Sequence, residues 1–156
     1  MTGVAVPDGA LLLDNQLCFM VYRLHRGITD LYRPVLSELG LTYPQYLVML
    51  VLWEDEPLTV HQIGQRLRLD SGTLSPLLKR LEAAGLIERT RSRADERSVV
   101  VSLTAAGRRL RDRAGRVPAV IGQCLAASAD EYSQVRSFLV DLLHRVDDAA
   151  TENHPA

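Results

Sequence analysis

Residues 58–85 read LTVHQIGQRLRLDSGTLSPLLKRLEAAG, and this stretch decides the fold. Thr59 followed three residues later by Gln62 is a capping-box pattern, which predicts that a helix begins there. After a turn at residues 68–70 a second helix is expected, with Ser71 as its cap. Two short helices joined by a tight turn are therefore predicted. Apolar residues spaced by three and four give both helices an inward face: Ile63, Leu67, Leu74, Leu77, Leu78 and Leu81.

After the second helix, the spacing of apolar residues changes from the helical period to the strand period. Pro76 is expected near its start, because an interior proline would remove a backbone hydrogen bond. Gly85 is expected to end it. Beyond that glycine, LIERTRS (86–92) and RSVVVSL (97–103) alternate with period two around the polar turn RADE, which predicts two paired strands. A basic hairpin after two short helices indicates a winged helix-turn-helix over about residues 44–103.

Two further helices are expected before residue 58. Residues 12–31 carry an apolar stripe with helical spacing, and Pro34 is expected to kink or end that helix. The stretch TYPQYLVMLVLWEDE (42–56) predicts another helix, with Thr42 or Tyr43 before its start and a proline in its first turn.

The C-terminal side is also expected to be helical. Thr104 is expected to cap a long helix that Pro118 bends, and a last helix is predicted from about residue 130 to residue 146, followed by a frayed tail. The sequence therefore predicts one domain, residues 1–156, that is mainly α with a small β wing.

The terminal helices carry more apolar surface than one small winged-helix core needs. Packing of residues of about 12–36 and 104–147 against the same helices of a second copy would bury that surface, so a homodimer is expected. A twofold dimer would place two DNA-reading helices one turn of the duplex apart, roughly 10 base pairs, on a pseudo-palindromic operator.

Charge is segregated along the chain, although the net charge is only −1. Residues 61–116 carry thirteen Lys and Arg against six Asp and Glu, whereas the rest of the chain carries five against thirteen. A basic middle between acidic ends is typical of a double-stranded DNA-binding module on a non-binding scaffold. The alternative is an arginine-rich solvated surface.

The predicted second helix of the pair suits the major groove, and the hairpin tip suits the adjacent minor groove. Serine and threonine hydroxyls can contact bases or phosphates, and basic side chains can neutralise phosphates. An ordinary amphipathic helix with a solvated polar face is the alternative for these positions. The candidate DNA-binding residues are Ser71, Thr73, Ser75, Lys79, Arg80, Arg91, Arg93 and Arg97.

Several classes of protein are excluded by composition. The two cysteines, Cys18 and Cys124, lie far apart and form neither a secreted disulfide framework nor a zinc motif. No apolar run is long enough to span a membrane, and the first residues lack the basic region of a signal peptide. The chain is therefore expected to be cytoplasmic, with no cofactor and no metal.

Four segments of the chain resemble one family. NQLCFMVY, LYRPVL, LTYPQYLVMLVLWE and LDSGTLSPLLKRLE, with the wing segment DERSVVVSLTAAG, are similar to the MarR family of winged-helix regulators. Within that family they resemble the repressors that sense organic hydroperoxides, the OhrR type. The resemblance covers nearly all of the chain.

The resemblance implies roles for particular residues. Cys18 matches the peroxidatic thiol, and Tyr32 and Tyr43 match hydroxyls that bond to it, partly from the partner subunit. Tyr22 also corresponds to a family position, and Cys124 falls where two-cysteine members have a resolving thiol. The implied function is a repressor that is released from its operator when Cys18 becomes a sulfenic acid and then a disulfide with Cys124, between subunits.

The residues themselves fit this chemistry. Cys18 is expected near the start of its helix, where unpaired backbone N–H groups favour an anion. Tyr22 lies one turn further on the same face. Without the resemblance, Tyr32 and Tyr43 would be interpreted as packing residues, and Cys124 could be a buried small apolar residue.

Two other functions are open at this stage. One is a MarR-type repressor released by a small phenolic or aromatic ligand, with Cys18 only packed. The other is a thiol peroxidase, which leaves the winged helix unexplained, so the chain is not expected to be an enzyme.

Overall fold

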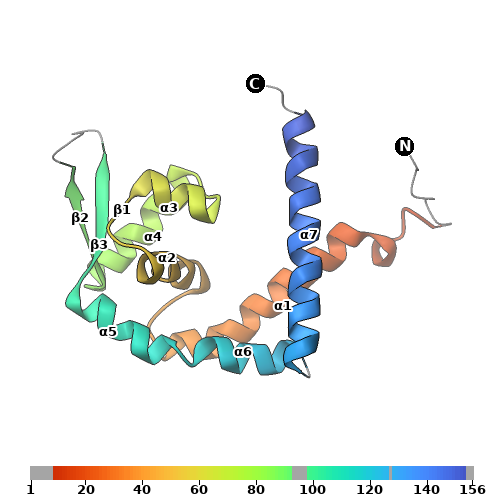
Figure 1. Cartoon of the computed structure of the whole chain (residues 1–156), viewed down its shortest axis with the longest axis horizontal. Coiled ribbons are helices and arrows are strands. Elements are labelled where there is room, and N and C mark those ends of the chain that lie inside the picture. The colour runs from red at the N-terminus through yellow and green to blue at the C-terminus, as the bar shows by residue number, and fades with distance from the viewer. Residues whose placement is uncertain (1–8, 93–97, 127, 154–156) are drawn as a thin grey trace. The chain divides into compact units, whose positions relative to one another are not determined.

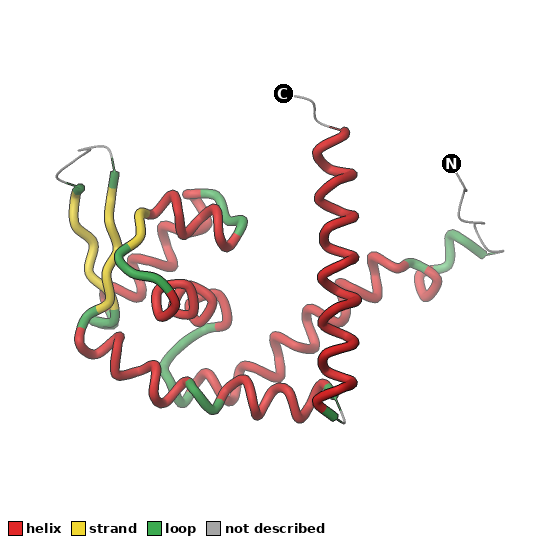
Figure 2. Tube along the Cα trace, viewed as in Figure 1, coloured by secondary structure: helices red, strands yellow, loops and turns green. Residues whose placement is uncertain are grey.

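A computed structural model describes residues 9–92, 98–126 and 128–153, and it divides the chain into two units, Met1–Gly115 and Arg116–Ala156. Helices dominate both units (Figure 1, Figure 2). The first unit contains a short 3₁₀ helix, five α-helices and three strands, in the order η1 (Leu13–Asn15), α1 (Leu17–Ser37), α2 (Tyr43–Glu54), β1 (Leu58–Thr59), α3 (Val60–Leu67), α4 (Ser71–Ala83), β2 (Ile87–Arg91), β3 (Val99–Leu103) and α5 (Ala105–Ala114).

Helix α2 lies at the centre of the first unit. It is apolar on almost every side, which is the pattern of a helix surrounded by other elements, and it contacts α1, α3, α4, α5 and β3. Val48 and Met49 are fully buried. The Trp53 side chain is also buried, and its Nε1–H donates to the Gly107 carbonyl oxygen at 2.9 Å. This bond joins α2 to α5 across the core.

Helices α3 and α4 form the predicted helix-turn-helix. Thr59 and Gln62 make the expected capping box at the start of α3. Arg68, in the left-handed conformation, ends α3. The cap of α4 differs from the prediction: Asp70 takes that position and accepts from the Thr73 N–H, so Ser71 is instead the first helical residue.

Pro76 was wrongly placed near the start of its helix. It lies in the interior of α4, as the sixth residue. A proline there leaves the carbonyl four residues earlier, that of Gly72, without its helical N–H. Leu74, Leu77 and Leu78 are all buried on the inner face, and this packing holds the helix together.

The wing is the expected hairpin, with one more strand than predicted. β2 and β3 pair antiparallel from Ile87 with Leu103 to Arg91 with Val99. β1, only two residues long, pairs with the other side of β3, which gives the order β1-β3-β2. The polar turn at residues 93–97 lies outside the described residues.

The first helix begins later and ends later than predicted. Residues 13–15 form a separate 3₁₀ turn, and α1 starts at Leu17. Pro34 does not end the helix, which continues through it to Ser37. The last turn is held by Leu36, which is 0% exposed in the core.

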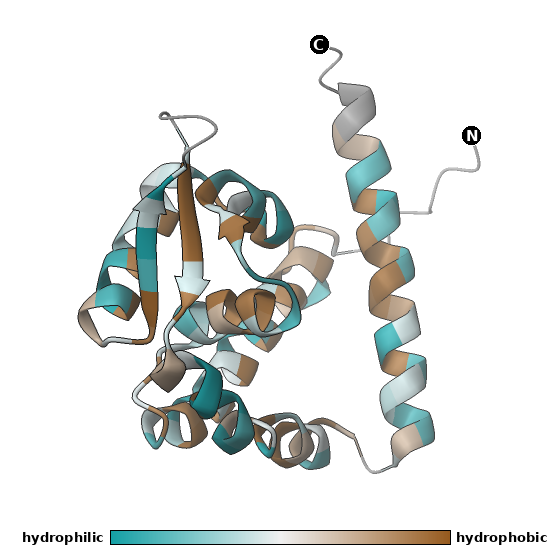
Figure 3. Ribbon diagram, turned by 60° about the vertical axis from the view of Figure 1, so that its left-hand side comes forward, coloured by the Kyte–Doolittle hydropathy of each residue, from teal (hydrophilic) through white to brown (hydrophobic). Residues whose placement is uncertain are grey.

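The second unit consists of α6 (Val117–Leu125) and α7 (Ala129–Asn153). Pro118 lies in the first turn of α6, so it starts a new helix where the sequence predicted a bend in a long one. Helix α7 is longer than predicted and includes part of the expected tail. Figure 3 shows apolar residues along α7. Six large apolar side chains of this helix are exposed: Tyr132, Val135, Phe138, Leu139, Leu143 and Val146.

Within the described residues, no helix is both long and apolar enough to cross a membrane.

Candidate functional site

The outer face of α4 presents most of the predicted major-groove residues. Ser71, Thr73, Lys79 and Arg80 are exposed, and Ser75 is half-buried. They follow one another along a helix whose inner face is fixed by buried leucines. The structure therefore gathers all five on one element.

Asp70 restricts what one of these residues can do. Its carboxylate accepts from the Thr73 N–H at 2.8 Å and from the Thr73 hydroxyl at 3.0 Å. These two bonds lower the pKa of Asp70 below its usual value. Because an ionised carboxylate has no proton to give, the Thr73 hydroxyl must be the donor, and its oxygen is left as an acceptor only.

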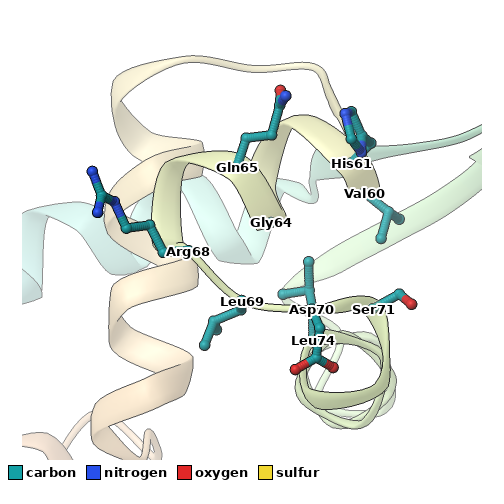
Figure 4. A pocket seen from close by; sticks show the side chains of 9 residues that line it. All are labelled: Val60, His61, Gly64, Gln65, Arg68, Leu69, Asp70, Ser71 and Leu74. Atoms are coloured by element: carbon teal, nitrogen blue, oxygen red, sulfur yellow. The ribbon is translucent and has the colours of Figure 1, made fainter. Parts of the chain in front are cut away.

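A hollow of about 560 Å³ lies between α3 and the first turn of α4 (Figure 4). Gly64 lies at its base, where an added Cβ would lie 2.8 Å from the Leu69 carbonyl oxygen, so the turn between the two helices can lie this close to α3 only because this residue has no side chain. His61, Gln65 and Arg68 line the hollow from α3. Sequence reasoning missed these three; their exposed positions on the helix before α4 were the available signal.

The wing supplies one described arginine. Arg91 is exposed at the end of β2. Arg93 and Arg97, the other two predicted wing residues, lie outside the described residues.

Cys18 is the second residue of α1 and is exposed. It therefore lies in the first helical turn, as predicted. Tyr22 follows one turn later and is 53% exposed. The guanidinium of Arg26, one further turn along, donates to the Tyr22 hydroxyl oxygen at 3.1 Å and lies 5.7 Å from its ring centroid. The bond to Tyr22 raises the pKa of Arg26.

Tyr32 and Tyr43 are brought together where α1 meets α2. Their ring centroids lie 4.9 Å apart. Tyr46 lies 5.9 Å from Tyr32 and 6.3 Å from Trp53, which continues the aromatic row into the core. Burial raises the pKa of the Tyr43 phenol, and burial followed by the neighbouring Tyr43 raises that of Tyr46. Tyr46 was missed from the sequence, although its spacing of three residues from Tyr43 places both on one face of α2.

The thiol and the tyrosine pair of the same chain are far apart. Cys18 and Tyr32 lie on one continuous helix, fourteen residues apart. At a rise of 1.5 Å per residue this separates them by about 21 Å along the axis. A hydrogen bond between this thiol and these hydroxyls within one chain is therefore impossible.

Cys124 is the penultimate residue of α6. Its side chain is exposed in the single chain that the structure describes. No group of three or more potential ligands among the described residues could hold a metal ion.

Comparisons with known proteins show that the chain is similar to transcriptional regulators. The pattern that describes the transcriptional regulator SarA/Rot family matches residues 30–113. The organic hydroperoxide resistance transcriptional regulator of Bacillus subtilis is 50% identical over 131 residues, which cover 84% of this chain and 89% of that protein.

Two solved structures of the protein AbfR of Staphylococcus epidermidis also match. Reduced AbfR bound to DNA is 36% identical, with a TM-score of 0.79, over 92% of this chain and 98% of the other. Disulfide-formed AbfR is 36% identical, with a TM-score of 0.63, over 88% and 92% of the two chains.

Proposed function

The chain belongs to the SarA/Rot and MarR type of winged-helix transcriptional regulators, within the group of organic hydroperoxide resistance regulators, and from this premise we propose that it represses transcription until an organic hydroperoxide oxidises Cys18. It is a regulator and not an enzyme, as are the proteins it matches. Its partner is an operator in double-stranded DNA, read by α4 in the major groove and by the wing beside it.

One observation carries the proposal: about 21 Å of α1 separates Cys18 from Tyr32, and Tyr43 packs against Tyr32 at the far end. Hydroxyls that cannot reach the thiol of their own chain can reach the thiol of a second copy arranged antiparallel to it. Tyr22 lies one turn beyond Cys18 on the same helical face and is a further candidate donor, although its hydroxyl accepts from Arg26 in the single chain. The site is therefore complete only in a homodimer.

The exposed apolar surface of the terminal helices supports the same assembly. In α1, as in α7, large apolar side chains are exposed in the single chain, and a soluble chain buries such a continuous surface against a partner. In a twofold dimer both copies use the same face. The exposed large apolar residues of α1 are Leu17, Met20, Val21, Tyr22, Leu24 and Leu31.

The oxidation proceeds in two steps. The Cys18 thiolate attacks one peroxide oxygen, the O–O bond breaks, and the products are a sulfenic acid and an alcohol after the alkoxide takes up a proton. The Cys124 thiol then attacks the sulfenic sulfur, which releases water and leaves a disulfide. Leu17 and Met20 beside the sulfur favour lipophilic hydroperoxides over hydrogen peroxide.

The disulfide releases DNA because recognition needs both half-sites at once. A covalent link between the two chains, together with loss of the tyrosine hydrogen bonds, changes the spacing of the two α4 helices. A dimer that can bind only one half-site loses the additional affinity that comes from binding both half-sites of one operator at once.

The experiment uses a duplex selected from a random pool by the reduced protein. Fluorescence anisotropy of that duplex is followed while cumene hydroperoxide, hydrogen peroxide or salicylate is added to the wild type and to the Cys18→Ser and Cys124→Ser variants. Cumene hydroperoxide should release the wild type at the lowest concentration and leave Cys18→Ser bound. Release of Cys18→Ser by the hydroperoxide, or release of the wild type by salicylate in the presence of dithiothreitol, would contradict the proposal.

A further inference from the structure

One ion pair ties the reading helix to the wing. Arg89, in the middle of β2, donates to the same Glu82 carboxylate oxygen twice, from Nε at 3.0 Å and from Nη2 at 2.5 Å. Glu82 lies in the last turns of α4. The two side chains are 38% and 27% exposed for Glu82 and Arg89, so the pair is partly shielded from water. Arg89 also holds the pKa of the Glu82 carboxyl below its usual value.

The Glu82–Arg89 pair lies between the two elements that carry candidate DNA-binding residues. Because side chains alternate along a strand, Arg89 and Arg91 project from the same face of β2. Glu82 is seven residues beyond Ser75 on α4, which is two helical turns, so the two share a face of that helix. The pair therefore joins the base of the arm that carries Arg91 to the helix that carries Ser75.

The surroundings of Arg89 show that it spans a gap and does not lie on a flat surface. A hollow of about 560 Å³ between α3, α4 and the hairpin is lined by Ser75, Arg89, His61 and Ser98, among other residues. Within the described ranges, the sheet and α4 meet mainly at β2. The Arg89 guanidinium, paired with Glu82, bridges β2 and α4 beside this hollow.

We propose that Glu82 and Arg89 are positioning residues for DNA recognition: their ion pair fixes the wing at the angle to α4 at which helix and wing contact one duplex together. Neither residue needs to touch DNA in this role. This inference rests on the proposed function: on a DNA-binding face the negative charge of Glu82 repels phosphates, so Glu82 can improve binding only through the position that it gives the wing.

This role can be tested by asking whether removal of the Glu82 charge strengthens or weakens DNA binding. By Coulomb's law alone, Glu82→Gln should strengthen binding, because it deletes a negative charge beside DNA. By positioning, it should weaken binding, about threefold for each of two wings and so about tenfold for a dimer. Glu88→Gln is the matched control, since Glu88 is exposed on the opposite face of the same strand and its loss removes the same charge.

Operator affinity is measured by anisotropy from 50 to 200 mM salt, on full-length protein with dithiothreitol present, so that sulfur chemistry plays no part. If the wing of Glu82→Gln no longer reaches the DNA backbone, the slope of log K against log salt should fall in magnitude by about 0.9 for each phosphate that is no longer neutralised. A variant that is only less stable would keep the slope. An unchanged slope, or binding of Glu82→Gln at least as tight as that of Glu88→Gln, would overturn the proposal.

The reciprocal exchange separates positioning from direct contact. A chain with Glu82→Arg and Arg89→Glu keeps its net charge and can rebuild the pair, so it should bind more tightly than either single variant. A direct phosphate contact by Arg89 would instead leave the exchanged chain as weak as Arg89→Glu alone. That result would also overturn the proposal.

Discussion

Mixed dimers offer the sharpest test of where the tyrosines act. In one dimer, a Cys18→Ser chain with intact tyrosines is paired with a chain that carries Cys18 and both Tyr32→Phe and Tyr43→Phe. In the second dimer, all three substitutions are on one chain and the other is wild type. Each dimer thus has one Cys18 and one complete tyrosine pair, and they differ only in whether these lie on different chains or on the same chain.

The structure sets the expected difference. About 21 Å along α1 separates Cys18 from Tyr32 of its own chain, whereas a hydrogen bond spans about 3 Å. The first dimer should therefore react with cumene hydroperoxide like the wild type. In the second, the thiol lacks two donors to a charged sulfur, each worth about 1.5 kcal/mol, so its rate should fall roughly 100-fold.

The two dimers are made by co-expressing chains with different affinity tags and purifying on both tags in turn. The rate is followed by trapping the remaining thiol and quantifying the Cys18 peptide by mass spectrometry. Wild-type and doubly Cys18→Ser dimers give the upper and lower limits. If the second dimer reacted as fast as the first, the tyrosines would not act across the subunits, and the reasoning from the length of α1 would be refuted.

The remaining predictions concern the framework that carries these sites. Glu56 accepts from the Leu103 N–H at 2.7 Å and from Arg108 at 2.8 Å; burial by itself raises its pKa, but these bonds outweigh burial and lower it. The stabilisation that the ionised Glu56 gives the folded chain is therefore complete above the unfolded pKa near 4.3 and is lost as the pH falls through the folded pKa. Glu56→Gln should lower the free energy of urea unfolding by about 1 kcal/mol at pH 7 and by much less at pH 3. Trp53→Phe should cost about 1–3 kcal/mol, because the Gly107 carbonyl loses its buried donor; circular dichroism must follow it, since this is the chain's only tryptophan. Gly107→Ala should be still more destabilising, since its Cβ would lie 2.0 Å from a backbone oxygen, and a thermal midpoint equal to that of the wild type would contradict this.

Local signals in the sequence predicted the elements that depend on neighbouring residues. Thr59 and Gln62 cap α3 as expected, because the capping box is complete within four residues. The cap of α4 was misassigned because Asp70 and Ser71 are adjacent and both residue types can cap. Strand β1 was missed because a two-residue strand exists only through its pairing with β3, more than forty residues away.

The sequence likewise predicted those parts of the candidate site that lie within one element better than those formed between elements. The outer face of α4 follows from helical spacing alone, and the structure shows four of the five expected residues exposed there, with Ser75 half-buried. Tyr32 and Tyr43 could be connected only through the resemblance, since nothing in their spacing predicts rings 4.9 Å apart on two helices. Arg89 was not singled out, because its importance comes from Glu82, which lies on a different element.

The hydrogen bond between Thr73 and Asp70 limits which bases the Thr73 hydroxyl could bind. A hydroxyl oxygen with no proton to offer can pair only with an exocyclic amino group, which in the major groove belongs to adenine or cytosine. Guanine and thymine present acceptors at the corresponding edge, and against either of them this oxygen would face another lone pair. If Thr73 faces a base as proposed, Asp70 therefore restricts which base that can be, through its hydrogen bond to the Thr73 hydroxyl.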